Sequence, residues 1–368
     1  MVRHPPMTTA NRSVLVTDSD TGQNRSALAA VRALAAAGYE PVVATAARHS
    51  IAAGSRHCAA RLSVPPVRSA DYAARIRTEL ARRPYLCVLP SSDATLIALD
   101  EPGQHLLDKE RLAQRAGAVG IPFPAHRLFA SGLELRAAAG QLDYPVAIKL
   151  VVRGPMVVLN VTRADTASDL EGLPLGDDPV LVQRWIDEPM QALAGVAWQG
   201  SFAATVHQRY LRTWPVEAGV ACAAMTTEPD LQLEQQVLSL LGGFDGIFQA
   251  QFVGGQLIDL NPRVYGSLPL AVASGANLPA ILCELTAGRA PPSVRARVGV
   301  RYRWVEGDVR HLLAGLRAGR LSSGEVATAL RPRRSSAHSV IALRDPGPVL
   351  ARLRFTARGK VREVVQPR

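Results

Sequence analysis

Three oxygen-bearing side chains stand close together in the segment FQAQFVGGQLIDLNPR, residues 248–263. Gln251 ends one expected strand, and Asp259 and Asn261 lie two apart on the next, so the latter two share a face. Amide and carboxylate oxygens suit Mg²⁺, which also keeps water and phosphate oxygens in its shell. Arg263 follows with a planar fork of donors that could neutralise charge on a transferring phosphoryl group. This pattern is typical of a metal-assisted phosphoryl-transfer site.

The turn at Gly254 and Gly255 decides whether these ligands can meet. A strict two-residue turn would pair Gln251 with Ile258 instead of Asp259. A convergent site therefore requires a three-residue loop or a bulge, which the glycines make feasible. The alternative is an ordinary hairpin with polar outer residues, and the segment alone does not decide between the two.

Two lysines stand where a phosphate could bind. Lysine is scarce in this chain: Lys109, Lys149 and Lys360 are its only three, and all other basic side chains apart from histidine are arginines. Lys149 ends the apolar strand in YPVAIKL, where an inward ammonium group needs a phosphate or a carboxylate as its partner. Lys109 opens a helix in LLDKERL, a position that is most often solvated. Because lysine acts as a compact point charge on phosphate, its use at these two places favours phosphate binding.

The first hundred residues have the alternation of a parallel α/β lobe. Apolar strands are expected at residues 13–18, 41–45 and 85–90, and a helix at 26–37. The residues SSD that follow the third strand supply helix-capping side chains. The residues DSDTGQN, from Asp18 to Asn24, follow the first strand, where such lobes often bind ligands. They lack the GxGxxG pattern, so we expect no dinucleotide there.

The middle of the chain has a different order of expected elements. Helices interleave with hairpins, which favours α+β lobes over one doubly wound sheet. Helices are expected at 108–118 and 229–241, strands at 144–151, 180–186, 246–253 and 256–260, and a strand or hairpin at 198–212. Pro291 and Pro292 mark an expected boundary, with a helix at 307–316 and an arginine-rich loop at 331–336 beyond it.

The order of these motifs resembles the ATP-grasp superfamily. Asp108 and Lys109 are followed by GIPFP, YPVAIK, LVQRWI, GIFQAQF and LIDLNPR, a pattern similar to the carbamoyl-phosphate synthetase large subunit and related carboxylate–amine ligases. The resemblance covers roughly residues 13–292. It implies an ATP-grasp fold of α/β and α+β parts, with ATP held between two α+β subdomains. The expected parts are a loose tail at 1–12, an N-terminal parallel α/β (pre-ATP-grasp) domain at 13–105, an ATP-grasp domain at 106–290 and a small C-terminal lobe at 291–368.

The resemblance also implies roles for single residues. Gln251, Asp259 and Asn261 match the metal ligands, with Asp259 shorter than the usual glutamate. Arg263 matches the arginine that contacts the transferred phosphate, and together with Lys149 it is expected to be catalytic. The expected nucleotide-binding residues are Lys109, Lys149, Arg153, Gln183, Trp185, Ile186 and Glu188.

Two departures from the family pattern concern the nucleotide. The loop after the second lysine is usually rich in glycine, but here VRGPM at 152–156 has one glycine, and Arg153 could replace backbone donors. The hinge usually supplies an acidic residue to the ribose, but Arg184 and Pro189 stand in the expected acidic positions. Only Asp187 or Glu188 could substitute, which predicts unusual nucleotide affinity or base selectivity.

The net charge of +11 suggests nucleic acid as a partner, but the arrangement of charge does not. The arginines are spread along the chain, without an RNP motif, zinc-finger spacing or a basic helix with heptads. The first twelve residues are polar and unlike a secretory signal, and no apolar run is long enough to cross a bilayer. We therefore expect a cytoplasmic protein with neither nucleic acid nor membrane as its main partner.

The expected activity is that of a carboxylate–amine ligase. ATP and Mg²⁺, with Mn²⁺ as an alternative metal, would activate a small-molecule carboxylate as an acyl phosphate, and an amine would then attack it to form an amide. Dimers are common in the superfamily, so a homodimer is an option. Three alternatives stay open: an ATP-grasp enzyme with a thiol, hydroxyl or bicarbonate partner, a nucleotide-binding module without catalysis, and a nucleic-acid binder.

Overall fold

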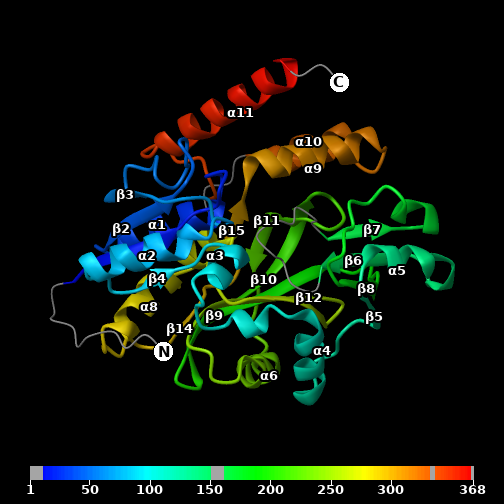
Figure 1. Ribbon diagram of the computed structural model, residues 1–368, viewed down its shortest axis with the longest axis horizontal. Helices are drawn as coiled ribbons and strands as arrows, with labels where there is room; N and C mark the ends of the chain where they lie inside the picture. Colours follow the sequence, from blue (N-terminus) through cyan, green and yellow to red (C-terminus); the bar gives the residue numbers. More distant parts are fainter. Residues whose placement is uncertain (1–10, 151–160, 332–335, 366–368) are drawn as a thin grey trace.

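The computed structural model describes residues 11–150, 161–331 and 336–365. Three sheets and the helices around them make up this part of the chain (Figure 1). Residues 1–10 of the expected tail, the loop at 152–156 with Arg153, and residues 332–335 lie outside it.

A four-stranded parallel sheet forms the N-terminal lobe, as predicted. Its strands in spatial order are β3 (Ala60–Ser63), β2 (Glu40–Thr45), β1 (Ser13–Thr17) and β4 (Val88–Leu89). Every residue of β1 is buried, because Val14 and Val16 belong to the apolar cluster of α1 (Arg25–Ala36). Leu15 belongs to the cluster that contains Tyr72 and Ile76 of α2 (Asp71–Arg82). A strand covered on both faces reads as a continuous apolar run, which is why the sequence reveals it.

A second sheet of four antiparallel strands follows. Its order is β5 (His126–Phe129), β8 (Val180–Arg184), β6 (Val146–Leu150) and β7 (Thr162–Ala164). One face packs against α5 (Gly132–Ala137) through Phe129, Leu135, Ile148 and Val182. The other face turns toward the large sheet.

The large sheet occupies the middle of the molecule (Figure 1). Its main path is β13 (Gln256–Asn261), β12 (Gly246–Val253), β9 (Met190–Trp198), β10 (Ser201–Trp214), β11 (Val220–Thr226), β15 (Arg301–Arg303) and β16 (Ser336–His338). The short strand β14 (Val294–Arg295) pairs with β10 in parallel orientation. The helices α4 (Lys109–Ala118) and α6 (Leu231–Leu241) pack with β12 and β13 around Phe248 and Leu260.

The helices near the C-terminus close the fold on one side. They are α9 (Val305–Arg317), α10 (Ser323–Leu330) and α11 (Gly347–Val365), the last of which runs across the top of Figure 1. The boundary predicted at residue 290 stays a prediction, since β14, β15 and β16 beyond it pair with the large sheet. Shorter helices are α3 (Asp93–Ala98), α7 (Leu268–Ala273) and α8 (Leu278–Thr286), with 3-10 turns at Gln104–Leu106, Ala139–Gln141 and Ala167–Leu170.

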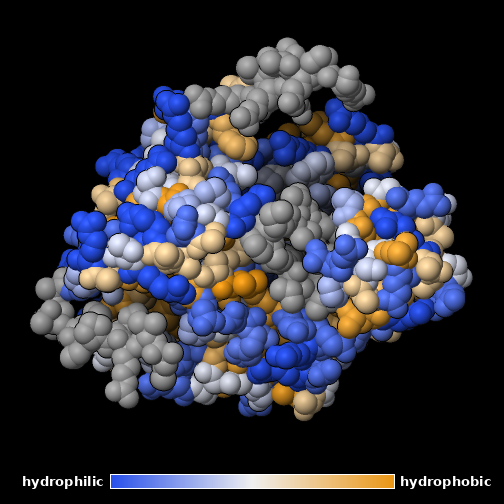
Figure 2. All heavy atoms as spheres, viewed as in Figure 1, coloured by the Kyte–Doolittle hydropathy of each residue, from blue (hydrophilic) through white to orange (hydrophobic). Residues whose placement is uncertain are grey.

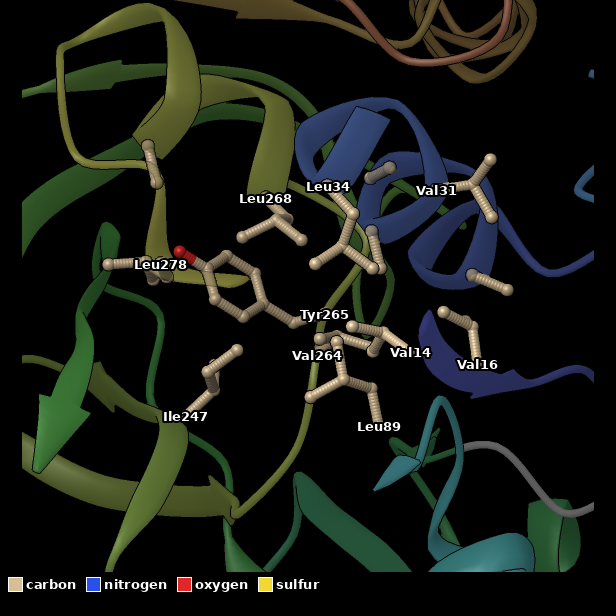
Figure 3. Packing of buried hydrophobic residues seen from close by; sticks show 14 of the residues in the cluster. Val14, Val16, Val31, Leu34, Leu89, Ile247, Val264, Tyr265, Leu268 and Leu278 are labelled. Atoms are coloured by element: carbon tan, nitrogen blue, oxygen red, sulfur yellow. The ribbon is translucent and has the colours of Figure 1, made fainter. Parts of the chain in front are cut away.

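One apolar cluster joins the N-terminal lobe to the large sheet. Val14 and Leu34 of the lobe belong to the same buried cluster as Ile247, Tyr265 and Leu278 (Figure 3). Close packing of this kind resists sliding, because any shift would open voids between interlocked side chains. The start of α1 is therefore held at a fixed place relative to the large sheet.

Hydrophilic and hydrophobic residues are interspersed on the face of the molecule shown in Figure 2. Within the described ranges, no helix has both the length and the apolar character needed to span a membrane.

Candidate active site

A cavity of about 720 Å³ opens between the second sheet, the large sheet and the start of α1. The second sheet contributes Lys149 and Gln183, the large sheet contributes Gln251 and Asp259, and the start of α1 contributes Arg25. Polar groups from four separate parts of the chain thus converge on one space, which is the usual arrangement of a ligand site.

Strand alternation directs the second sheet's polar side chains into this cavity. Val146 and Ile148 belong to the apolar cluster beside α5, whereas Ala147 and Lys149 line the cavity. Successive residues of a strand point to opposite faces, so YPVAIKL places its lysine away from the apolar cluster. Ala147 lies opposite Gln183 in the β6–β8 ladder, which brings Gln183 to the same face.

A bulge in the β12–β13 hairpin aligns the expected metal ligands. The turn is a two-residue turn, with positive φ angles of 55° at Gly254 and 75° at Gly255. The register then shifts between Gln251 and Phe252, so Ile258 is an extra residue and Gln251 lies opposite Asp259. The prediction that convergence requires a bulge or a longer loop is confirmed.

The two lysines come from different elements and both contact strand β13. Lys109, the first residue of α4, is only 4% exposed, and its ammonium group is hydrogen-bonded to the carboxylate of Asp259. Lys149 donates a 2.9 Å hydrogen bond from Nζ to the carbonyl oxygen of Ile258. Neither ammonium group is solvated as a surface lysine would be, because both lie against the bulged strand.

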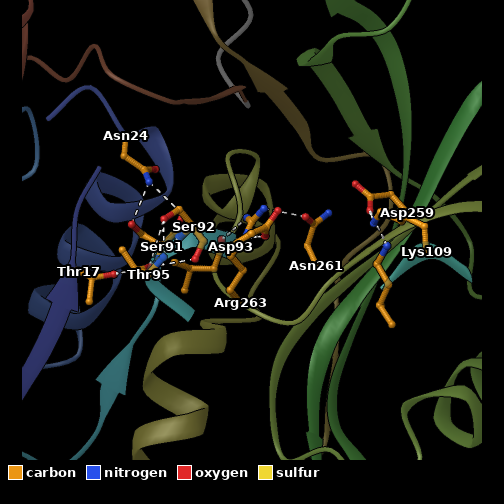
Figure 4. A network of polar contacts seen from close by, with 12 residues as sticks. Thr17, Asn24, Ser91, Ser92, Asp93, Thr95, Lys109, Asp259, Asn261 and Arg263 are labelled. Atoms are coloured by element: carbon orange, nitrogen blue, oxygen red, sulfur yellow. Dashed lines mark hydrogen bonds and ion pairs between the residues drawn. The ribbon is translucent and has the colours of Figure 1, made fainter. Parts of the chain in front are cut away.

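Arg263 lies between the N-terminal lobe and Asn261. Its Nε is 2.5 Å from Oδ1 of Asp93, the first residue of α3, and its Nη2 donates to Oδ1 of Asn261 at 2.7 Å. Figure 4 shows a row of polar side chains from Asn24 through Ser91 and Arg263 to Asp259. The guanidinium group is thereby fixed in place beside the expected metal ligands.

A tyrosine orients the amide of Gln251. Nε2 of Gln251 donates to the hydroxyl oxygen of Tyr210 at 2.8 Å, and both residues line the cavity. Burial raises the pKa of Tyr210 above its ordinary value, so the hydroxyl keeps its proton at neutral pH. It can therefore accept from Gln251 and still donate to a ligand.

The expected nucleotide-binding residues from β8 onward line the same cavity. Gln183 is 1% exposed, and neither atom of its amide has a hydrogen-bond partner in the described part of the chain. Trp185 lies beneath the guanidinium of Arg163, whose Cζ is 5.1 Å from the ring centre. Ile186 and Glu188 follow in the same lining. A buried amide without partners costs free energy unless a ligand or ordered water satisfies it.

Comparison with solved structures identifies the fold. The chain aligns with an L-amino acid ligase from Bacillus licheniformis at a TM-score of 0.55 and 14% identity, over 77% of this chain and 78% of that one. It aligns with the N5-carboxyaminoimidazole synthetase of Staphylococcus aureus in complex with ADP at a TM-score of 0.59 and 11% identity, over 80% and 82% of the two chains. The biotin carboxylase of Campylobacter jejuni in a nucleotide complex gives a TM-score of 0.57 and 13% identity, over 79% and 74%. The chain has the ATP-grasp fold. No protein-family model and no curated protein matches its sequence.

The predicted fold class is therefore confirmed, and the ATP-grasp cavity gathers most of the expected residues. Arg153 lies outside the described residues, and Lys109 contacts Asp259 without itself lining the cavity. The expected residues that line the cavity are Lys149, Gln183, Trp185, Ile186, Glu188, Gln251, Asp259, Asn261 and Arg263.

The donor set of this ATP-grasp site fits a hard divalent cation. Gln251, Asp259 and Asn261 offer amide and carboxylate oxygens on one face of two paired strands, where Mg²⁺ or Mn²⁺ would find suitable ligands. In the described ranges no group of three or more His, Cys, Asp or Glu side chains could hold a metal, so a site here depends on the amides. Lys109 and Arg263 already contact two of the three side chains and limit how much further positive charge they can bind.

Several residues in or beside the cavity were not expected from the sequence. Tyr210 and Arg25 line the cavity, and Asp93 holds Arg263 although its segment suggested only helix capping. Arg25 directly follows Asn24, whose side chain caps α1. The sequence offers one signal for Arg25: it is a basic residue at the first position of a helix, where acidic side chains are favoured.

Proposed function

We propose that the protein is an ATP-dependent ligase that activates a substrate carboxylate as an acyl phosphate for attack by an amine. The observation that carries the proposal is that three cationic side chains gather at the bulged hairpin: Lys109 contacts Asp259, Lys149 contacts the carbonyl oxygen of Ile258, and Arg263 contacts Asn261. Three positive groups at this hairpin, two of which line the cavity, suit a triphosphate and a second anionic reactant.

The cavity offers distinct places for the two ends of the nucleotide. Gln183, with its unsatisfied buried amide, and Trp185 suit the hydrogen-bonding edge and the flat face of adenine. Lys149 and Arg263 lie toward the hairpin and suit the phosphates. The γ-phosphate would then lie next to Asp259 and Asn261.

The first step transfers a phosphoryl group to the substrate. A carboxylate oxygen attacks the γ-phosphorus, the bond from this phosphorus to the β–γ bridging oxygen breaks, and ADP leaves with that electron pair. Negative charge accumulates on the oxygens around phosphorus, where the guanidinium of Arg263 and the ammonium of Lys149 stabilise it. Asp93 and Asn261 hold Arg263 in place before the reaction, so little reorganisation is needed.

The second step forms the new bond. The amine nitrogen attacks the acyl carbon, the bond from this carbon to the phosphate oxygen breaks, and phosphate leaves while the nitrogen loses a proton to solvent. A divalent cation held by Gln251, Asp259 and Asn261 would supply charge neutralisation on the phosphate oxygens. No side chain needs to become covalently attached to the substrate.

A screen for ADP release tests this proposal. Amino acids and small carboxylates are supplied with ATP and Mg²⁺, and hydroxylamine is added in parallel to trap an acyl phosphate as a hydroxamate. We expect ADP release that requires both a carboxylate and an amine, and a loss of at least tenfold in Lys149→Ala and in Asp259→Asn. Full turnover in both variants, or ADP release independent of every carboxylate, would contradict the proposal.

The same screen separates the alternatives. Thiols, alcohols and bicarbonate are included as partners, and mass spectrometry of the products identifies the bond formed. Biotin carboxylase shares the fold, so bicarbonate-dependent ADP release without hydroxamate formation from added carboxylates would favour a carboxylation instead. Steep salt-dependent retention on DNA or RNA, unaffected by ATP, would favour the nucleic-acid binder.

A further inference from the structure

Arg25 places a guanidinium group at the end of the cavity formed by the N-terminal lobe. Its Cζ lies 3.8 Å from the ring centre of Trp304, and its Nη1 donates to the hydroxyl of Tyr302 at 2.9 Å. The side chain also packs on Gly266, where a Cβ atom would come within 3.3 Å of Nη2. These contacts hold the guanidinium on three sides, so its position is built into the fold.

Arg25 has no acidic partner in the described part of the chain. None of the ion pairs there includes this residue, and the first turn of α1 holds no acidic side chain. A cation at the start of a helix is disfavoured by the helix dipole, whose positive end lies there. Tyr302 and Trp304 offset part of this cost through a hydrogen bond and a cation–π contact. An arriving anion would gain from both the guanidinium and the helix end.

Arg263, another arginine that lines the cavity, is already engaged. Arg263 bonds to Asp93 and Asn261, whereas Arg25 contacts the neutral side chains of Tyr302 and Trp304. Both arginines line the same cavity. Arg25 is thus a cavity-lining cation without an acidic partner among the described residues, and it can bind a ligand group that lies away from the phosphates.

Other polar residues that line the same cavity can add contacts to a ligand. Tyr265 is 2% exposed and lines the cavity, and its hydroxyl has no hydrogen-bond partner within the described residues. Tyr210 lies nearby and already links to the hairpin through Gln251. The motif from Asp18 to Asn24 leads directly into this place, since Gln23 and Asn24 also line the cavity.

We propose that Arg25 binds a second carboxylate of the substrate, remote from the carboxylate that becomes phosphorylated. The substrate class is then a small dicarboxylate, or a pair in which the amine reactant is an amino acid with a free carboxylate. This inference rests on the proposed ligase function. The planar guanidinium, already oriented by Tyr302 and Trp304, suits a planar carboxylate.

Direct binding tests the proposal without any turnover. Calorimetric titration compares each member of a panel of dicarboxylates and α-amino acids with its monoamide, in which the second carboxylate is neutral. For at least one pair we expect the charged form to bind the wild type about 10- to 100-fold more tightly. In Arg25→Gln this preference should vanish, and in Arg25→Lys part of it should remain. Arg77→Gln on the exposed face of α2 is the matched control and should keep the full preference.

Three outcomes would overturn the proposal. The first is equal binding of every charged and neutral pair by the wild type, and the second is an unchanged preference in Arg25→Gln. The third is a stronger preference for phosphate monoesters than for carboxylates, which would identify a phosphate site instead. If Arg25→Gln fails to fold, the wild type and Arg25→Lys still give the comparison. ADP release is measured separately, so its absence would end the ligase proposal, whereas binding alone decides the role of Arg25.

Discussion

Lys149 donates a 2.9 Å hydrogen bond to the carbonyl oxygen of Ile258, the extra residue of the bulge in β13. A bulge leaves one residue outside the regular ladder, and here the carbonyl of that residue receives the lysine. The same irregularity that brings Asp259 opposite Gln251 therefore also positions the ammonium group. The bulge couples the second sheet to the large sheet across the cavity.

Lys149 is expected to act on ATP as a point charge. Lys149→Ala should lower kcat/KM for ATP about 10- to 100-fold, because a charge-assisted contact to phosphate is lost. Lys149→Arg should recover only part of this loss, since the longer planar group does not reproduce an ammonium. Steady-state ADP release measures both, with exposed Arg77→Ala as the control. An arginine variant as active as the wild type would mean that only the charge matters here.

The ion pair of Lys109 and Asp259 is expected to contribute to the stability of the fold as well as to activity. Asp259→Asn leaves a buried ammonium group without its carboxylate and should lower the free energy of unfolding by about 3 kcal/mol. Adding Lys109→Met removes the unpaired charge and should restore most of this stability without restoring turnover. Urea denaturation and ADP release on the two single variants and the double variant form the cycle. Additive losses of stability would show that the two groups do not interact.

Gln183 is expected to lower the free energy of unfolding of the protein without nucleotide, and to bind the base of ATP. Its buried amide has no partner in the described part of the chain, so Gln183→Leu should raise the free energy of unfolding by about 1 kcal/mol. The same change should weaken ATP binding about tenfold and reduce discrimination between ATP and GTP, because the amide would no longer meet the base. Calorimetry with both nucleotides and urea denaturation give the two readings. A variant that loses stability and keeps its nucleotide affinity would assign Gln183 to the core.

Asp93 is expected to position Arg263 without touching the substrate. Asp93→Asn removes the charge that holds Arg263 at 2.5 Å, so kcat should fall about tenfold while KM for ATP changes little. Asp93→Glu keeps the charge and should retain more activity. A larger rise in KM for ATP than fall in kcat would indicate that Asp93 acts through the nucleotide pocket instead.

Asp18 is expected to make stability depend on pH. Burial raises its pKa from 3.8 to about 6, although bonds from Ser50 and Ser19 oppose the rise. A carboxyl whose pKa is raised by folding stabilises the fold below its unfolded pKa, and this contribution is lost as pH rises through the folded pKa. Relative to Asp18→Asn, the wild type should therefore lose about 2–3 kcal/mol between pH 4 and pH 7. Urea denaturation at several pH values measures the difference, and a constant gap would rule out this titration.

Apolar patterns in the sequence reveal several of the elements, and the residue types in its motifs suggest the ligands. Fully buried strands such as β1 are recognisable because both faces are apolar, and Lys149 is recognisable because a charge interrupts an apolar run. Its scarce lysines and the order of its motifs already predicted the ATP-grasp fold, which the comparison with solved structures confirmed.

Which side chains meet depends on how distant parts of the chain pack together. The bulge that aligns Gln251 with Asp259 depends on how β12 pairs with β13 and β9, and two glycines permit it without requiring it. Arg25 reaches the cavity and Asp93 reaches Arg263 because the apolar cluster around Tyr265 fixes the N-terminal lobe against the large sheet. Contacts between residues 170 or more positions apart, such as Asp93 with Arg263, arise from this packing and leave no local pattern in the sequence.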